Sequence, residues 1–368
     1  MGSDILSVAA RFRTDGKVLS VAPLGEGHIN GTYLVKTDSG KKYALQRINT
    51  AVFKRPEDVM SNIRLVLSHL RRKILASGGN PDRECLTVVE AESGKDLVFA
   101  EDGGCYRMYV FVEGTAYQTP ETPEPFYRAA KAFGTFQRQL SDFPASSLAE
   151  TIPHFHDTPR RLENLEKAIR EDKCGRVAEV QSEIAFARAR RDACRLVVDA
   201  IAAGEIPLRV THNDTKLNNV LLDGDAGGFC VIDLDTVMPS FIFSDFGDFL
   251  RSAANTTAED DPDLNNVSFN FDIFKSFTKG YLKGAASFIT PIEIENLPFA
   301  TALFPYMTLV RFIADYINGD IYFHCKYPEH NLVRSRNQLK LTKCVEAAFP
   351  QMEAFIDDQL KKLGIYDV

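Results

Sequence analysis

The sequence predicts an α+β protein of two lobes, a small antiparallel β-sheet lobe with one helix and a larger, mainly helical lobe. Short runs of β-forming residues, separated by glycine and Asp-Gly turns, fill the first third of the chain. Long stretches with apolar residues at helical spacing fill the remainder. The change falls at Glu113-Gly114. We therefore expect one lobe at residues 1–112 and the other at residues 113–368, with a hinge near residues 111–114.

The first lobe is expected to contain several strands and a single helix. The helix begins after Pro56 and carries Val59, Ile63, Leu67 and Leu70 at helical spacing. Three strands, a helix and further strands is the order of a kinase small lobe, so we expect a bilobal, protein-kinase-like fold. The expected strands are Val18–Ala22, Thr32–Thr37, Lys42–Ile48, Leu86–Glu90, Leu97–Ala100 and Tyr106–Val112.

The second lobe is expected to consist of long amphipathic helices. The sequence contains no internal repeat and no low-complexity segment that would favour a solenoid or a linker. The expected helices are Phe126–Leu140, Arg160–Ile169, Ile184–Ala203, Phe271–Leu282, Ala300–Tyr316 and Arg336–Leu363.

The composition is that of an ordinary soluble globular protein, with 45% hydrophobic and 25% charged residues. No uninterrupted apolar run is long enough for a membrane span, and the N-terminus lacks a signal-peptide pattern, so we expect a cytoplasmic protein. Seven scattered cysteines without a C-x-x-C pair suggest reduced thiols. The net charge of −7 gives no general attraction to nucleic acid or to anionic membranes. Nothing points to an obligate protein partner.

A motif in the second half of the chain has the layout of a phosphoryl-transfer centre. The kinase catalytic loop H-x-D-x-x-x-x-N is matched by His212, Asp214 and Asn219. The apolar run 229–232 then predicts a strand that ends directly before Asp233. In that loop the aspartate lies beside the acceptor hydroxyl, so we predict Asp214 as the catalytic residue. A carboxylate and an amide oxygen suit Mg2+, so we predict Asn219 and Asp233 as metal ligands. Lys216 is expected beside the transferred phosphoryl group, and His212 as scaffold.

Two further carboxylates near this motif need separate interpretation. Asp245-Phe246-Gly247 spells the metal-binding triplet of protein kinases but opens an apolar, helix-like run. We therefore expect Asp245 to start a helix and to brace the catalytic loop through its backbone amides, rather than to bind metal. Asp235 lies two positions beyond Asp233, and either a metal or substrate contact or a turn-stabilising role fits it.

The predicted first hairpin is rich in glycine, from Gly25 through Gly27 to Gly31. Glycines at such a turn let backbone N–H groups approach a phosphate, so Gly25 and Gly27 are candidate phosphate-binding residues. His28 and Asn30 are polar groups that a simple turn does not require. One or both could reach the acceptor substrate.

The third predicted strand departs from the kinase pattern Val-Ala-Ile-Lys. This chain has Tyr43-Ala44-Leu45-Gln46, so Gln46 occupies the position of the lysine. Strand alternation places Gln46 on the same face as Ala44, toward the nucleotide. Either Gln46 contacts phosphate as a neutral donor, or Lys216, the metal and the loop amides carry the phosphate charge, or the chain is a degenerate nucleotide binder.

The segment 208–219, followed by 232–236, resembles the aminoglycoside phosphotransferase and choline kinase superfamily. Within that superfamily the chain is most similar to the bacterial N-acetylhexosamine 1-kinases. The catalytic loop is common to the superfamily, whereas the flanking matches are more specific. They lie at Gly25–Asn30, His154–Pro159, Asp245–Asp248, Arg311–Tyr316, Gly319–Phe323 and Lys326–Arg334.

This resemblance implies phosphorylation of the anomeric hydroxyl of N-acetylglucosamine or N-acetylgalactosamine, with ATP and Mg2+ as cofactors. It also implies a sugar site that contains His28, Asp214, Arg311 and Tyr322. The adenine would pair with backbone between Phe111 and Glu113, with Ala44 among its apolar covers.

Two alternative functions remain open from the sequence. The first is a kinase for another small hydroxyl acceptor, such as an aminoglycoside, a choline-like amino alcohol or a different sugar. An amine acceptor needs a pocket rich in carboxylates, which the acidic run 259–261 could supply. The second is a nucleotide-binding pseudokinase, which only the missing lysine at Gln46 supports.

Overall fold

The computed structural model describes residues 5–24, 30–118, 120–224 and 228–365. The chain forms two compact units. The first contains Met1–Tyr117, Asp142–Pro153 and Asn218–Pro239, and the second contains the rest. The expected division into residues 1–112 and 113–368 is thus simpler than the observed one, because two later segments join the N-terminal part.

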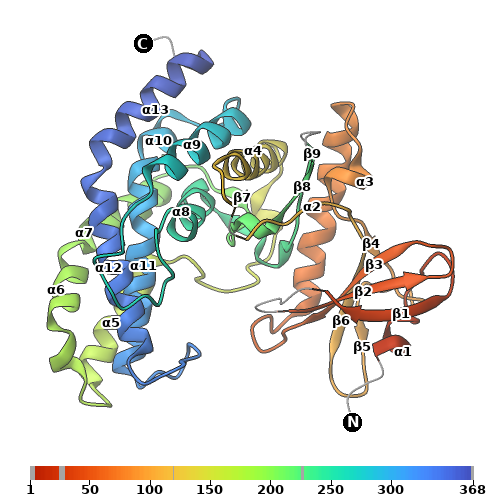
Figure 1. The fold of residues 1–368 in the computed structure, drawn as a ribbon, viewed down its shortest axis with the longest axis horizontal. Coiled ribbons are helices and arrows are strands. Elements are labelled where there is room, and N and C mark those ends of the chain that lie inside the picture. The colour runs from red at the N-terminus through yellow and green to blue at the C-terminus, as the bar shows by residue number, and fades with distance from the viewer. Residues whose placement is uncertain (1–4, 25–29, 119, 225–227, 366–368) are drawn as a thin grey trace. The chain divides into compact units, whose positions relative to one another are not determined.

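The first unit is built on an antiparallel sheet with strand order β1-β2-β3-β6-β4, to which β5 is added beside β6 (Figure 1). Each of the expected strands is present, although β4 and β5 are only two residues long. The strands are β1 (Val18–Pro23), β2 (Gly31–Thr37), β3 (Lys42–Ile48), β4 (Val88–Val89), β5 (Val98–Phe99) and β6 (Cys105–Val110).

One face of this sheet is covered by its own hydrophobic core. Val35, Leu45 and Met108 from the central strands are fully buried there, in the same hydrophobic cluster as Val8 of α1 (Ile5–Ala9). Strand alternation therefore directs Ala44 and Gln46 to the opposite face, as expected from the sequence.

The long helix of the first unit is α2 (Pro56–Ala76), which starts at a proline and carries acidic residues only in its first turn. A short helix, α3 (Pro81–Glu84), follows it. The later segments add the hairpin of β8 (Val220–Asp223) and β9 (Gly228–Val231) and two 3-10 turns, η1 (Ala145–Ser147) and η4 (Leu234–Thr236).

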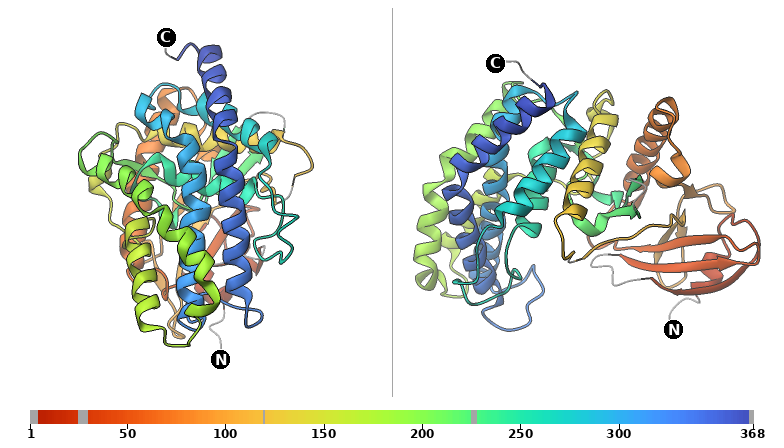
Figure 2. Two further views of the ribbon diagram at one scale, coloured as in Figure 1. Left: turned by 90° about the vertical axis from the view of Figure 1, so that its left-hand side faces the viewer. Right: turned by 45° about the horizontal axis from the view of Figure 1, so that its top comes forward.

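The second unit is mainly helical, and Figure 2 shows its long helices running side by side. Two expected helices are interrupted. The stretch 184–203 breaks at Arg190, and the stretch 336–363 breaks at Ala348 because Pro350 cannot continue a helix. The elements are α4 (Glu124–Gln139), α5 (Thr158–Glu171), η2 (Val177–Val180), α6 (Gln181–Ala189), α7 (Arg191–Ala202), β7 (Arg209–Thr211), α8 (Ile242–Ala253), α9 (Phe271–Ala285), α10 (Pro291–Glu295), α11 (Leu297–Ile317), α12 (His330–Ala347) and α13 (Phe349–Leu363); η3 (Leu217–Asn219) and β10 (Met238–Ser240) lie where the chain passes between the units.

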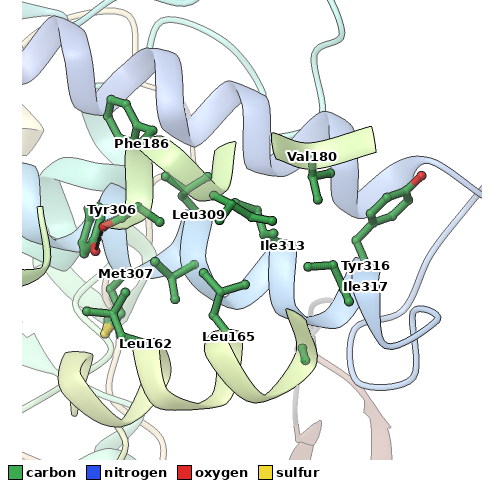
Figure 3. Close-up of a cluster of buried hydrophobic side chains, with 14 of the residues drawn as sticks. Leu162, Leu165, Val180, Phe186, Tyr306, Met307, Leu309, Ile313, Tyr316 and Ile317 are labelled. Carbon is green, nitrogen blue, oxygen red and sulfur yellow. Dashed lines mark hydrogen bonds between the residues drawn. The ribbon is translucent and has the colours of Figure 1, made fainter. Parts of the chain in front are cut away.

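Helix α11 is the central core helix of the second unit. Its Leu309 and Ile313 are fully buried and pack with Leu162 and Leu165 of α5 and with Phe186 of α6 (Figure 3). The helix is long and apolar enough to cross a membrane, a feature that a search for uninterrupted apolar runs misses. However, 89% of its apolar window is buried inside the protein, and this core role accounts for the composition.

Helices α4 and α9 approach each other closely through glycines. A Cβ atom at Gly134 would lie 2.6 Å from the carbonyl oxygen of Tyr281, and one at Gly284 would lie 2.6 Å from that of Lys131. A Cβ atom at Gly280 would overlap the carbonyl oxygen of Tyr127. The close approach also positions Gln137 of α4, which donates a hydrogen bond to Asp245 of α8.

We predict that Gly280→Ala destabilises the protein by about 1–3 kcal/mol, because the added methyl group has no space against the α4 backbone. Helix propensity alone would favour alanine by about 1 kcal/mol, so the sign of the effect separates the two influences. Urea denaturation measures it, with the exposed Lys283→Ala in the same helix as control. A Gly280→Ala variant as stable as the control would show that the helices are not in close contact here.

Candidate functional site

The predicted phosphoryl-transfer motif is divided between the two units. Asp214 and Lys216 belong to the second unit, and Asn219 and Asp233 to the first.

In the second unit, Asp245 braces the loop that follows β7. Its carboxylate accepts hydrogen bonds from the backbone N–H groups of His212, at 3.0 Å, and Asn213, at 2.7 Å. Its carbonyl oxygen accepts the Thr215 hydroxyl at 2.7 Å. Asn213 adopts a φ of 64°, a left-handed conformation that asparagine tolerates better than most residues. The predicted bracing role of Asp245, rather than a metal-binding role, agrees with these contacts.

Buried side chains hold this brace in place. Gln137 of α4 donates to the Asp245 carboxylate at 2.6 Å and accepts a hydrogen bond from Tyr281 of α9. Burial raises the pKa of Asp245, although its hydrogen bonds oppose the shift. The His212 ring is fully buried with its edge against Phe133, 5.5 Å between centroids, which fits the expected scaffold role.

The loop places Asp214 next to Lys216. The Lys216 ammonium lies 2.6 Å from the Asp214 carboxylate. Burial opposes the charge of this lysine, but Asp214 and Asp248 together outweigh it and raise its pKa. The pair is therefore a carboxylate held beside a permanent positive charge.

Asp214 and Lys216 line a cavity of about 280 Å³ that lies wholly within the second unit. Its other charged residues come from α8, α11, α12 and the segment after α8: Asp248, Arg251, Glu259, Arg311 and Arg334. Phe304, Phe312 and Phe323 supply apolar wall. A small cavity with aromatic walls and a few converging charges is typical of a small-molecule site.

The cavity carboxylates are bound by cations. Asp248 lies 3.3 Å from Arg251, and Glu259 lies 2.9 Å from Arg251 and 3.6 Å from Arg334. Burial raises the pKa of Asp248 to about 6, against the opposing effect of Arg251. The acidic run 259–261 thus does not form an open anionic pocket, since Asp260 also pairs with Lys326 at 2.8 Å.

Arg311 differs from the other cavity arginines. Within the described ranges, no carboxylate forms an ion pair with it, and its guanidinium lies over the rings of Phe323, at 5.2 Å, and Tyr322, at 5.9 Å. Burial, with the nearby Arg161 and Arg251, lowers its pKa. Arg311 therefore offers hydrogen-bond donors to a ligand in the cavity.

Tyr322 lies beside the cavity rather than in its wall. It is 73% exposed and lines an adjoining groove that shares Arg311 and Phe323 with the cavity. Asp315 fixes this loop by accepting the backbone N–H groups of Ile321, at 3.1 Å, and Tyr322, at 2.9 Å. The predicted pair Arg311 and Tyr322 is thus brought together.

Sequence reasoning missed His156 in the cavity wall. Its ring stacks on Phe155, with centroids 4.4 Å apart, and meets the edge of Phe304 at 4.9 Å. Burial, together with Arg311, lowers its pKa to about 3, so the imidazole is neutral at physiological pH. The match at 154–159 was the only signal in the sequence, and it did not indicate which residue faces the cavity.

In the first unit, Asn219 and Asp233 lie at the same end of the β8–β9 hairpin. Val220 pairs with Val231, and the N–H of Ile232 donates to the Asn219 carbonyl at 2.9 Å. Asp233 then turns the chain with a left-handed φ of 59°. Amide and carboxylate oxygens are ligand types that Mg2+ accepts in proteins, so these two neighbouring positions of the hairpin are candidates for holding it.

Asp235 has a structural role. The residue is 2% exposed, and its carboxylate forms an ion pair with Arg107 of β6 and accepts a hydrogen bond from Asn30 at 2.6 Å. The sequence left two roles open for Asp235, a metal or substrate contact and the stabilisation of its turn. These contacts fit the second role. Arg107 was not singled out from the sequence, although a charged residue in the otherwise apolar strand 105–110 is an available signal.

Some of the remaining predicted binding residues of the first unit are described by the structure, and others are not. Ala44 is half-buried on the face of β3 away from the core. The N–H of Phe111 is used by the Lys42 carbonyl, and the Glu113 carboxylate pairs with Lys42 at 2.8 Å. Gly25, Gly27 and His28 lie outside the described residues.

Comparison with known proteins gives a family match. The sequence model of the phosphotransferase enzyme family matches residues 20–272, which is most of the chain and includes all of the motif from His212 to Asp233.

Solved structures share the fold. A microcompartment-associated aminopropanol kinase is 18% identical over 95% of this chain and 97% of its own, with a TM-score of 0.63. Amicoumacin kinase hAmiN, in complex with AMP-PNP, Ca2+ and Ami, is 15% identical over 91% and 92%, with a TM-score of 0.61. An aminoglycoside phosphotransferase from Alicyclobacillus acidocaldarius is 13% identical over 97% and 96%, with a TM-score of 0.58. The expected kinase-like α+β fold is thereby confirmed.

We predict that Asp248 makes the folded protein less stable as pH rises from about 4 to 6. Its pKa is raised from 3.8 to about 6, so the folded state binds the proton more tightly than the unfolded state across this window. Chemical denaturation at several pH values should show that the slope of the unfolding free energy against pH is more negative in the wild type than in Asp248→Asn. The exposed Asp357→Asn serves as control and should keep the wild-type slope. Equal slopes in wild type and Asp248→Asn would contradict the assignment.

Proposed function

Because this chain belongs to the phosphotransferase enzyme family, we propose that it transfers the γ-phosphoryl group of ATP to the anomeric hydroxyl of an N-acetylhexosamine. The family match establishes the reaction class, a phosphotransferase. The proposal extends it to a donor, a metal and an acceptor.

The observation that carries the choice of acceptor is the charge of the cavity beside Asp214. Asp248 and Glu259 are bound by arginines, Asp214 is bound by Lys216, and Arg311 has no carboxylate partner among the described residues. An ammonium group brought into this cavity would meet cations without a vacant carboxylate. A neutral, oxygen-rich ligand instead finds guanidinium donors for its hydroxyl and carbonyl oxygens.

The shape and walls of the cavity also favour a sugar. A volume of about 280 Å³ is small for a ligand site, and four phenylalanines line it. Aromatic walls suit the apolar C–H faces of a pyranose, and Arg311 and the neutral His156, which line the same cavity, are proposed to form hydrogen bonds with the ring substituents. The anomeric position and the acetamido group rest on the resemblance of the flanking segments, such as 319–323 and 326–334, to the N-acetylhexosamine 1-kinases.

In the proposed reaction, Asp214 accepts a hydrogen bond from the acceptor hydroxyl and orients it for attack. It takes the proton late, because the phosphoryl-transfer transition state is loose and positioning outweighs base strength. Lys216, 2.6 Å from Asp214, is proposed to place its positive charge beside the transferred phosphoryl group, where it stabilises the negative charge of the transition state. Asp245 keeps the loop in this shape through the N–H groups of His212 and Asn213.

The first unit is proposed to hold the nucleotide and the metal. Asn219 and Asp233 are the residues that would bind Mg2+, and their neighbouring positions at one end of the β8–β9 hairpin suit that role. When bound, the ion neutralises charge on the phosphates. Ala44 and the segment 111–113 are the proposed adenine contacts, and the Gly25, Gly27 and His28 assignments remain predictions from the sequence.

A kinase for an amino alcohol or an aminoglycoside is the second candidate, since relatives with those substrates share the fold. We predict that the protein with Mg-ATP releases ADP rapidly with N-acetylglucosamine or N-acetylgalactosamine. Turnover should be at least about 100-fold slower with choline, 1-amino-2-propanol or an aminoglycoside, because a buried unpaired charge costs several kcal/mol. A coupled ADP assay measures this. Faster turnover of any amine acceptor would refute the sugar assignment.

We predict that Asp214→Asn lowers kcat by a factor of about 10³ or more, since the amide cannot accept the proton. Affinity for Mg-ADP should change less than about threefold, because Asp214 is assigned to the acceptor. Calorimetric titration with Mg-ADP provides that comparison, and the exposed Asp357→Asn is the matched control for activity. Near-normal turnover by Asp214→Asn would remove this residue from the catalytic role.

A further inference from the structure

Gln46, which stands at the position of the strand lysine in kinases, is held by a buried arginine. Gln46 of β3 and Arg107 of β6 are directly opposite each other in the antiparallel register. The Arg107 guanidinium donates to the Gln46 side-chain oxygen twice, from Nε at 3.0 Å and from Nη2 at 2.8 Å. Arg107 is fully buried.

This contact determines which way the amide of Gln46 faces. A guanidinium carries donors only, so the oxygen of the amide must be the atom that meets Arg107. The amide nitrogen is thereby turned outward. One of its N–H groups lies 3.3 Å from the hydroxyl of Thr32, and no acceptor among residues 5–24, 30–118, 120–224 and 228–365 takes the other. A half-buried side chain thus presents an oriented donor.

The donor lies on the functional face of the sheet. Leu45 points into the core on one side, so Ala44 and Gln46 point to the other. On that side, Arg107 also forms the ion pair with Asp235, two residues from the proposed metal ligand Asp233. Burial acts to lower the pKa of Arg107. The negative charges of Asp235 and Asp233 act in the opposite direction, and the pKa is raised overall.

We propose that Arg107 is a positioning residue for the nucleotide: it fixes Gln46 with the amide N–H toward the phosphates and replaces the lysine–glutamate ion pair of kinases. The charge stays buried in Arg107 and Asp235, and the phosphate meets a neutral donor. The inference rests on the proposed use of ATP.

The arrangement explains why lysine is absent from this strand position. A lysine at position 46 would place a second cation against the buried Arg107, with Asp235 already engaged by Arg107 and Asn30. The acidic residues of α2, Glu57 and Asp58, lie in its first turn next to Arg55, where Asp58 pairs with that arginine at 2.9 Å. In kinases the ion pair joins a lysine of the sheet to a glutamate of the helix. In this chain the buried ion pair instead joins Arg107 of the sheet to Asp235, which follows the proposed metal ligand Asp233.

The variant Gln46→Glu tests the donor. A glutamate keeps an oxygen for Arg107 but has no N–H to offer, so the fold is retained and the phosphate contact is lost. Calorimetric titrations without acceptor, using Mg-ATP and adenosine as separate ligands, should show at least a tenfold loss of affinity for Mg-ATP. Affinity for adenosine, which has no phosphate, should be unchanged. Gln46→Met, which removes the amide without adding charge, should show the same pattern.

Two results would overturn the proposal. One is unchanged Mg-ATP affinity in both Gln46 variants, and the other is an equal loss for Mg-ATP and adenosine, which indicates a merely structural role. A wild-type protein that binds Mg-ATP but phosphorylates no hexosamine overturns the proposed acceptor and leaves this inference standing. A wild-type protein that does not bind Mg-ATP overturns both.

A mutant cycle tests whether Arg107 acts through Gln46. The double variant Arg107→Met/Asp235→Asn removes both buried charges together, so neither is left unpaired. In that background Gln46→Met should change Mg-ATP affinity less than twofold, because the amide is no longer held in place. A full tenfold effect in the double variant would show that Gln46 does not depend on Arg107. If the double variant does not fold, the Gln46→Glu titrations decide.

Discussion

The buried ion pair between Arg107 and Asp235 is the interaction on which the first unit depends. A fully buried guanidinium needs a counter-charge and partners for its donors; among the residues that the structure describes, Asp235 and Gln46 supply them. These contacts join β6, β3 and the turn after Asp233, and Asn30 extends them to the start of β2. Loss of one partner of such a pair costs about 3–5 kcal/mol. Arg107 therefore fixes both the turn that follows the proposed metal ligand Asp233 and the side chain of Gln46.

In the second unit, hydrogen bonds rather than a buried ion pair hold the predicted catalytic residues in place. Asp245 holds the catalytic loop through backbone N–H groups, and the glycine contact of α4 with α9 brings Gln137 and Tyr281 to it. This scaffold leaves Asp214 and Lys216 at the edge of a cavity whose carboxylates are bound by cations. In the proposed function, charge balance selects the acceptor: a neutral, oxygen-rich molecule gains hydrogen-bond donors, and an amine does not.

Local sequence patterns predicted much of this. The strands, α2 and the loop role of Asp245 follow from alternation, helical spacing and capping, which are properties of neighbouring residues. Arg107 escaped notice because its importance depends on Asp235, a contact across 128 positions of the chain that no local pattern reports. His156 and the pairing of Glu259 with two arginines were missed for the same reason. The break at Ala348 was readable from Pro350 but was outweighed by the apolar periodicity on both sides.

A competition experiment tests the central claim most directly. The protein is incubated with Mg-ATP and equal concentrations of N-acetylglucosamine, N-acetylgalactosamine and 1-amino-2-propanol, and the products are followed by 31P NMR. We predict that the new phosphomonoester signals couple to an anomeric proton of a hexosamine and that the amino alcohol is not phosphorylated. Phosphate transferred mainly to the amino alcohol, or to a sugar hydroxyl other than the anomeric one, would contradict it.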